Sequence, residues 1–453
     1  MRKFIVLLFC VMAGMLISCN DDEKYIPTPP EVAIESSNGS FAVAQEDTIV
    51  LKAKINSPLA TTLSWSVDGK EVSTDTTYTF AKKEPGKYEV ILKATNVDGE
   101  VSASSSIEVY GKYRYGTFIL NEGSVLSGLT STLIFINPKG EITDSVYYRV
   151  NGTFLGGCSQ DLFIKDKKMY IVAQNGGNDG YLTIANAETL KKERGFQEEL
   201  KGKLSMPTHI AVLSENDIYM RDNKGIWRFN PSTSELTFIK NSNGARKNTM
   251  AVVDSKLFAS ENENILVIES GKDTISHRIE FSGRISGVVP ASDGNLWASC
   301  AAGNGENAKI VKINPRDYSV IRTNVIEDKD VSGLLAPGFA STPGITAKGD
   351  TLYVSGTPYG AKPIYRHIFS KGETKLMVDI TKMVVDAGTI YNTVAVNPVT
   401  GEVMANTLKG FGPSYLTNQI TAFDFSGPEP KISAAYNDYT RFPGGIFFTY
   451  NFK

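Results

Sequence analysis

A degenerate repeat between residues 112 and 453 constrains the fold more than any other feature of this sequence. Each copy contains a short apolar segment, a segment built on one large side chain, and a segment that ends in a tight turn. The spacing between successive large residues ranges from 39 residues, between Tyr219 and Phe258, to 56, between Trp297 and Tyr353. A four-stranded propeller blade takes roughly 40 to 50 residues. The large residues are Phe118, Tyr170, Tyr219, Phe258, Trp297, Tyr353 and Met404. They predict a seven-bladed β-propeller over 112–453 and are interpreted as core.

The two ends of the repeat complement each other. The copy at Phe118 has no apolar segment before it, whereas residues 445–450 supply one that is left over. We therefore predict that the carboxyl-terminal strand is the innermost strand of the first blade. Such closure removes free sheet edges and holds the ring shut.

Residues 31–110 alternate apolar and polar positions in short runs separated by turn residues, which predicts a small β-sandwich. The segments around Trp65 and Tyr88 resemble bacterial Ig-like and PKD-type modules, and this resemblance implies that the two residues lie on different sheets. Because no cysteine occurs here, we expect packing around Trp65 to hold the sandwich, with a role as a spacer. The fold class is thus all-β, with a sandwich preceding a propeller.

The amino end has the pattern of an export signal. Arg2 and Lys3 precede an apolar stretch over 4–17, which is shorter than the ~20 residues of a membrane-spanning helix. Residues 16–19 resemble the lipobox of bacterial lipoproteins, which predicts a signal peptide over 1–18 and lipidation of Cys19. An ordinary secretory leader with an incidental cysteine is the alternative. The acidic, proline-bearing segment 19–30 is expected to be a tether, and it resembles the surface-export signal of Bacteroidetes lipoproteins. We expect outer-membrane localisation through a lipid anchor, with exposure at the cell surface.

Composition disfavours several classes of function. The formal net charge is −2, so no basic excess is present to bind nucleic acid. The chain has only three histidines, which leaves little for a metal centre or histidine-based catalysis. Cys158 and Cys300 fall in different blades and are expected to remain thiols. We therefore expect no enzyme activity, no cofactor and no metal.

Candidate ligand-binding residues lie in the loops around one end of the predicted channel, where aromatic, amide and charged groups accumulate. His209 and Asp161 open inner strands. A ligand contact and a hydrogen-bonded structural role for His209 both stay open. The candidate residues are Asn121, Glu122, Asn151, Phe154, Asp161, His209, Arg221, Asn223, Tyr359, Phe411, Tyr415, Arg441 and Phe442.

The stretch 115–123, the Leu155-Gly156 segment and the repeats resemble the YncE-like (YVTN) propellers of Bacteroidetes surface lipoproteins, and among these the BtuG-like proteins. This resemblance implies a non-catalytic protein that captures a nutrient for a TonB-dependent transporter. A corrinoid is the first expected ligand and a glycan the second. A cell-surface adhesion or protein-interaction scaffold is the alternative, and a propeller lyase or dehydrogenase is less favoured.

Overall fold

The computed structural model describes residues 25–123, 128, 130–338, 342–355 and 360–449. The predictions for the signal peptide, for Cys19 and for Tyr359 fall outside these residues. The chain divides into two compact units, one ending at Tyr110 and the other beginning at Gly111. Both are built from β-strands, which confirms the all-β class.

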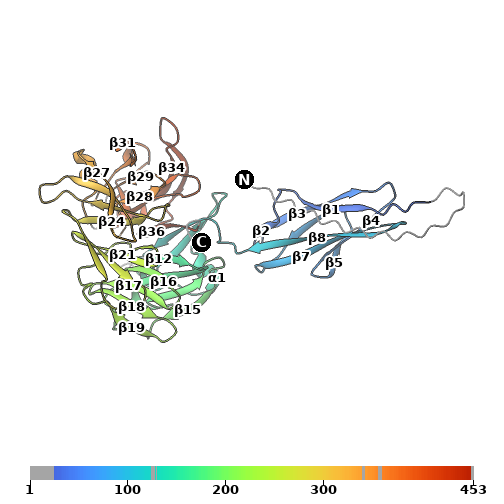
Figure 1. The fold of residues 1–453 in the computed structure, drawn as a ribbon, viewed down its shortest axis with the longest axis horizontal. Coiled ribbons are helices and arrows are strands. Elements are labelled where there is room, and N and C mark those ends of the chain that lie inside the picture. The colour runs from blue at the N-terminus through green and yellow to red at the C-terminus, as the bar shows by residue number, and fades with distance from the viewer. Residues whose placement is uncertain (1–24, 124–127, 129, 339–341, 356–359, 450–453) are drawn as a thin grey trace. The chain divides into compact units, whose positions relative to one another are not determined.

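The amino-terminal unit is a sandwich of two sheets (Figure 1). The smaller sheet has the order β1 (Glu31–Ser36), β3 (Thr48–Asn56), β6 (Thr77–Ala81). The larger sheet has the order β2 (Ala42–Ala44), β8 (Gly99–Tyr110), β7 (Gly86–Asn96), β4 (Thr62–Val67), β5 (Lys70–Ser73).

Trp65 is fully buried in the sandwich core with Phe80 and Leu92, as expected. Its indole N–H donates a 2.8 Å hydrogen bond to the backbone carbonyl of Asp75, which satisfies the polar edge of the ring. The expectation that Trp65 and Tyr88 lie on different sheets was wrong. Strands β4 and β7 pair directly in the larger sheet, with Trp65 opposite Leu92 in the antiparallel register.

The second unit contains seven four-stranded antiparallel sheets within the residues described (Figure 1). The innermost strands are β36 (Pro443–Phe448), β12 (Gly157–Lys165), β16 (His209–Ser214), β20 (Ala251–Val253), β24 (Ile285–Pro290), β28 (Ile345–Lys348) and β32 (Thr389–Val396). The second strands are β9 (Thr117–Asn121), β13 (Lys168–Gly176), β17 (Asp217–Asp222), β21 (Lys256–Glu261), β25 (Leu296–Cys300), β29 (Thr351–Val354) and β33 (Val403–Leu408).

The third and outer strands complete each sheet. The third strands are β10 (Thr132–Ile136), β14 (Leu182–Asn186), β18 (Gly225–Asn230), β22 (Asn264–Glu269), β26 (Ala308–Ile313), β30 (Pro363–Ile368) and β34 (Asn418–Asp424). The outer strands are β11 (Ile142–Thr143), β15 (Lys192–Phe196), β19 (Glu235–Phe238), β23 (His277–Glu280), β27 (Val320–Ile326), β31 (Glu373–Asp379) and β35 (Lys431–Asn437). Short helices α1 (Val146–Asn151) and α2 (Lys329–Leu334), and 3-10 turns η2 (Ile380–Lys382) and η3 (Gly412–Leu416), lie in the connections.

The repeat motifs occupy equivalent positions in successive sheets. The large residues from Phe118 to Met404 all lie on second strands and are buried, which confirms them as core. The turn after the third strand is closed by a side chain. Asn230, for example, accepts a 2.9 Å hydrogen bond from the backbone N–H of Ser232, and Asn314 accepts one of 3.0 Å from Arg316.

The carboxyl-terminal strand closes the ring, as predicted. Strand β36 pairs with β9, and Ile446 lies opposite Ile119 in the antiparallel register. Ile446 and Phe448 are buried with Ile134 and Met404, in a cluster shared by the first and last sheets. Hydrophobic packing therefore joins the two ends of the propeller.

Candidate functional site: the loop face around the channel mouth

The innermost strands of all seven sheets surround a cavity of about 650 Å³. Gln160 and Gly444 line the end where the inner strands begin, and Lys165 and Lys348 line the other end. In an antiparallel propeller, the connections entering the inner strands emerge at the same end as those joining second to third strands. We call this end the loop face. It is the end at which the sequence placed the candidate residues.

Asp161 and His209 are buried on adjacent inner strands, and both form hydrogen bonds within the fold. The two carboxylate oxygens of Asp161 accept hydrogen bonds from the backbone N–H groups of Leu162, at 2.9 Å, and Ile210, at 3.0 Å. His209 is 1% exposed, and its Nδ1 lies 2.9 Å from the hydroxyl oxygen of Thr208. Both side chains line the cavity, yet their polar groups are engaged by the fold. A structural role accounts for both.

Glu122 lies at the channel mouth, immediately after β9. The amide Nδ2 of Asn392 donates to its carboxylate across 3.3 Å and to the carbonyl of Pro443 across 3.2 Å. Burial raises the pKa of the Glu122 carboxyl to about 7, although Lys247, Gln160 and Asn392 oppose this shift. Gln160 beside it is only 3% exposed, and its amide oxygen has no hydrogen-bond partner among the described residues. The mouth thus holds a carboxyl group that titrates near neutral pH.

An aromatic patch lies next to Asn392, formed by Tyr391, Phe411, Tyr415 and Phe442. The rings of Tyr415 and Phe442 are stacked, with centroids 4.4 Å apart and planes at 25°. Tyr391 contacts Phe442 and Phe411 at centroid distances of 5.7 and 6.2 Å. Phe411 remains 38% exposed. Three of these residues were predicted from the sequence, and the structure brings them together.

A cationic arc follows the opposite side of the loop face, formed by Arg221, Arg246, Lys247 and Arg284. Desolvation lowers the pKa of Arg221, Arg246 and Lys247, and repulsion from another cation of the arc adds to each shift. The repelling cation is Arg246 for Arg221, Arg284 for Arg246, and Arg221 for Lys247. Lys247 also interacts electrostatically with Glu122 from the first sheet and with Cys158 from the second. Lys247 is carried by the connection between β19 and β20, and its charge is felt by groups at the channel mouth.

Two other predicted residues, Asn121 and Arg441, hold loops together. The amide Nδ2 of Asn121 donates to Thr132, at 3.1 Å, and to the carbonyl of Tyr439, while its oxygen accepts from the backbone N–H of Arg441, at 3.0 Å. The guanidinium of Arg441 donates to the carbonyls of Asp438 and Thr440. Asn121 is 1% exposed and is therefore not a ligand contact in this conformation.

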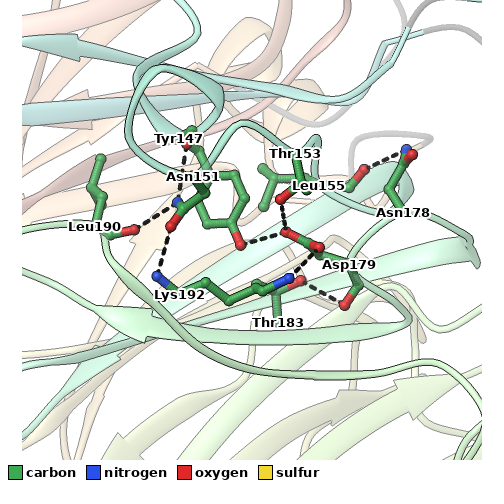
Figure 2. Close-up of polar contacts among 9 residues, drawn as sticks. All are labelled: Tyr147, Asn151, Thr153, Leu155, Asn178, Asp179, Thr183, Leu190 and Lys192. Atoms are coloured by element: carbon green, nitrogen blue, oxygen red, sulfur yellow. Dashed lines mark hydrogen bonds and ion pairs between the residues drawn. The ribbon is translucent and has the colours of Figure 1, made fainter.

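Asn151 belongs to a polar network around Asp179 (Figure 2). Its Nδ2 donates to the carbonyls of Tyr147 and Leu190, and its Oδ1 accepts from the backbone N–H of Lys192. The carboxylate of buried Asp179 accepts from the Tyr147 hydroxyl, the Thr153 hydroxyl and the Lys192 ammonium, each at 2.7 Å (Figure 2). The network fixes α1 and the following loop against the second sheet.

Three predicted residues remain, Phe154, Asn223 and Tyr359, and Tyr359 falls outside the described residues. Phe154 stacks on Tyr148 at 4.3 Å between centroids, and Asn223 is exposed after β17. Sequence reasoning missed Gln160, Arg246, Lys247, Arg284, Tyr391 and Asn392. The repeat could have indicated four of them. Arg246 and Lys247 come shortly before Thr249, the predicted start of one inner strand, and Tyr391 and Asn392 come directly before the equivalent residue Thr393.

Over the described residues, no group of three or more His, Cys, Asp or Glu side chains is arranged to hold a metal ion. Cys158 and Cys300 do not form a disulfide. The Cys300 thiol donates to the carbonyl of Gly283 at 3.1 Å. None of the helices in the described part of the chain has the length and apolar character needed to traverse a bilayer.

Two family models match the sequence. One, described as a domain of unknown function (DUF5074), matches residues 115–449, and a PKD-like domain matches residues 29–96. No curated protein matches the sequence.

Solved structures share the fold. A quinoprotein alcohol dehydrogenase-like protein from Bacteroides thetaiotaomicron is 19% identical, with a TM-score of 0.56, and the match covers 94% of this chain and 100% of that one. The β-propeller domain of Cps50 (Swd1) from Myceliophteria thermophila is 14% identical, with a TM-score of 0.43, over 63% of this chain and 87% of that one. At such identities the first likeness shows the fold alone, and the second carries no further weight.

Proposed function

The chain belongs to the family described as a domain of unknown function, DUF5074, and we propose that its propeller is a non-catalytic module that captures a solute on the loop face. The observation that carries this proposal is the placement of the aromatic patch beside Glu122 and Asn392 at the channel mouth. Binding sites combine apolar area with a few oriented polar groups, and this part of the loop face supplies both.

The absence of catalysis is part of the proposal. A general base must come within hydrogen-bond reach of a substrate, and a nucleophile needs an adjacent base. Asp161 is 4% exposed with both carboxylate oxygens bonded to backbone N–H groups, and His209 is 1% exposed. These are the two residues on which an enzyme hypothesis would rest.

The proposed cellular setting follows from the amino-terminal sequence. We propose that Cys19 carries the lipid anchor, that 19–30 is a tether, and that the protein lies on the outer surface of the outer membrane. The proposed partner is a TonB-dependent transporter that receives the captured nutrient. A corrinoid and a glycan are the two proposed ligands.

Isothermal titration of the purified protein tests capture directly. The probes are cobalamin, cobinamide, and neutral and acidic oligosaccharides. Binding of one class, weakened about tenfold by Phe411→Ala, is the expected result, since loss of an aromatic contact costs about 1 to 3 kcal/mol. Val399→Ala, at a side chain that is 61% exposed between β32 and β33, is the control. Heat signals absent for all of these probes would disprove capture.

A protein-interaction scaffold is the second candidate, and one observation favours it. The outer strand β27 exposes Val320, Ile321 and Val325 at 46%, 52% and 57%. Exposed apolar side chains on one outer strand suit contact with another protein. Purification from detergent-solubilised outer membrane separates the two functions, because co-purification of a transporter is expected only for nutrient capture.

A further inference from the structure

The cationic arc is drawn from three successive sheets. Arg221 is on β17, Arg246 and Lys247 lie between β19 and β20, and Arg284 lies between β23 and β24. Each of these connections ends at the loop face. The guanidinium of Arg221 donates to the carbonyl of Ala245 at 3.1 Å, so it is held next to the segment that carries the following two cations. The arc therefore runs from the third sheet into the connections that enter the fourth and fifth sheets.

Carboxylates near the arc form most of their ion pairs and hydrogen bonds with other groups. Glu261 pairs with Arg278 at 3.0 Å, and buried Asp222 accepts from the backbone N–H groups of Ser205, Lys224 and Gly225 while offsetting part of the charge on Arg221. In the part of the chain that the structure describes, the side chains of Arg246, Lys247 and Arg284 form no ion pair. Grouped like charges are unfavourable, and an external anion would relieve their repulsion.

The aromatic patch and the cationic arc face each other across the channel mouth. The patch belongs to the seventh sheet and to the connection into β36, whereas the arc belongs to the third, fourth and fifth sheets. Glu122 lies between them, bonded to Asn392 on the patch side and interacting with Lys247 on the arc side. A molecule that uses both surfaces must extend over the mouth, which a chain of linked rings can do.

We propose that the ligand is an acidic glycan, whose carboxylate or sulfate groups pair with Arg246, Lys247 and Arg284 while a sugar ring stacks on the aromatic patch. This inference rests on the proposed capture function and narrows its ligand class. Arginine presents a planar fork of donors that matches carboxylate and sulfate oxygens, and aromatic faces pack against the apolar faces of sugar rings. The same site would bind neutral glycans more weakly, because they would gain the aromatic contact without charge-assisted hydrogen bonds to the arc.

The test is isothermal titration of the purified protein with three oligosaccharides of equal length. An oligogalacturonate supplies carboxylates, a chondroitin sulfate oligosaccharide supplies carboxylates and sulfates, and a malto-oligosaccharide supplies neither. At least one acidic probe is expected to bind ten times more tightly than the neutral probe. The acidic probe that binds more tightly shows whether the site prefers carboxylate groups alone or sulfate groups as well.

The variant Arg246→Gln/Arg284→Gln examines the arc itself. Neither side chain makes a hydrogen bond among the described residues, so the fold should tolerate the exchange. Binding of the acidic probe should weaken at least tenfold, since each charge-assisted hydrogen bond contributes appreciably. Arg316→Gln is the matched control. Arg316 is 82% exposed in the connection between β26 and β27, which emerges away from the loop face, and its exchange should leave affinity within twofold.

The outcomes separate this inference from the proposed function. Equal affinity for acidic and neutral probes, or unchanged acidic affinity in the double variant, overturns the acidic-glycan assignment and leaves capture standing. Tight corrinoid binding without glycan binding has the same consequence. No binding of oligosaccharides or corrinoids overturns both.

Discussion

Asp161 accepts a 3.0 Å hydrogen bond from the backbone N–H of Ile210 and so joins the inner strands of two neighbouring sheets. Its other oxygen accepts from the N–H of Leu162 at 2.9 Å. A carboxylate can serve two donors at once, whereas an amide offers one accepting oxygen. Asp161, which the sequence suggested as a ligand contact, thus links strands β12 and β16 through hydrogen bonds.

Burial raises the pKa of the Asp161 carboxyl to about 7, so the contribution of its hydrogen bonds is measured in acid, where no buried charge is removed with them. Asp161→Ala should lower the free energy of unfolding by about 1 to 3 kcal/mol in urea denaturation at about pH 4, because the buried N–H groups of Leu162 and Ile210 would lose their acceptor. Asp254→Ala, at an exposed turn position, supplies the comparison and should alter stability by less than about 0.5 kcal/mol. Equal effects of the two substitutions would show that the bond to Ile210 contributes little.

Glu122→Gln should stabilise the protein at pH 8 and leave it unchanged near pH 4. The pKa of Glu122 is raised from 4.5 to about 7 in the fold, so the unfolded chain releases this proton first as the pH rises. Stability is lost progressively between pH 4.5 and about 7, and the full penalty remains at higher pH. A gain of about 1 to 3 kcal/mol is expected, since one pKa unit corresponds to about 1.4 kcal/mol and Glu122 keeps some solvent contact.

Unfolding free energies of both proteins from pH 4 to pH 8 provide the measurement. Glu373→Gln, at an exposed position of β31, is the control and should alter stability by less than about 0.5 kcal/mol. A difference in unfolding free energy between Glu122→Gln and wild type that does not change with pH would rule out a raised pKa for the Glu122 carboxyl.

Tyr147→Phe should destabilise the protein by about 1 to 3 kcal/mol at pH 7, because Asp179 would lose a 2.7 Å hydrogen bond to its charged form. Although burial opposes ionisation, hydrogen bonds from Lys192, Tyr147 and Thr153 lower the pKa of Asp179. A carboxyl group whose pKa is lowered by folding stabilises the protein above its unfolded-state pKa. This stabilisation is lost as the pH falls through the folded-state pKa.

The difference between wild type and Tyr147→Phe should accordingly shrink when unfolding is measured at pH 3. Tyr148→Phe is the neighbouring control, because Tyr148 is 43% exposed and contributes a ring contact to Phe154. A loss at Tyr147 that persists undiminished in acid would contradict the role assigned to the Asp179 carboxylate.

Phe448→Ala should cost about 3 to 5 kcal/mol, because Phe448 is 4% exposed in the cluster that joins the first and last sheets. Urea denaturation compares it with Val399→Ala, at an exposed position in the connection between β32 and β33. A cost similar to that of the control would mean that β36 adds little to the stability of the ring.

Periodic features of the sequence predicted the fold well for a physical reason. Each sheet must bury one large residue on its second strand and close a turn after its third, so Phe118 and its counterparts, and Asn230 with its following proline, recur at matching positions. The leftover strand at 445–450 predicted closure because an unpaired sheet edge is unfavourable.

The candidate site was predicted only in part, because loop residues follow no period. A polar side chain in a loop can bind a ligand or satisfy nearby backbone, and the sequence does not distinguish these uses. Asn121 and Asn151 proved to bond backbone carbonyls, whereas Phe411, Tyr415 and Phe442 share one patch. Arg221 was predicted, but the other three cations of the arc were missed because Arg246 and Arg284 are adjacent only through the packing of neighbouring sheets.

The pairing of β36 with β9 also sets an order of events during biosynthesis. Residues near 117 must wait for those near 448 before their sheet is complete, so the ring stays open throughout most of translation. Any product that ends early would expose the edge of β9 and the apolar surface around Ile119 to other nascent chains. Quality control by proteases or chaperones would therefore recognise such a fragment through its first sheet, far from the point at which synthesis failed.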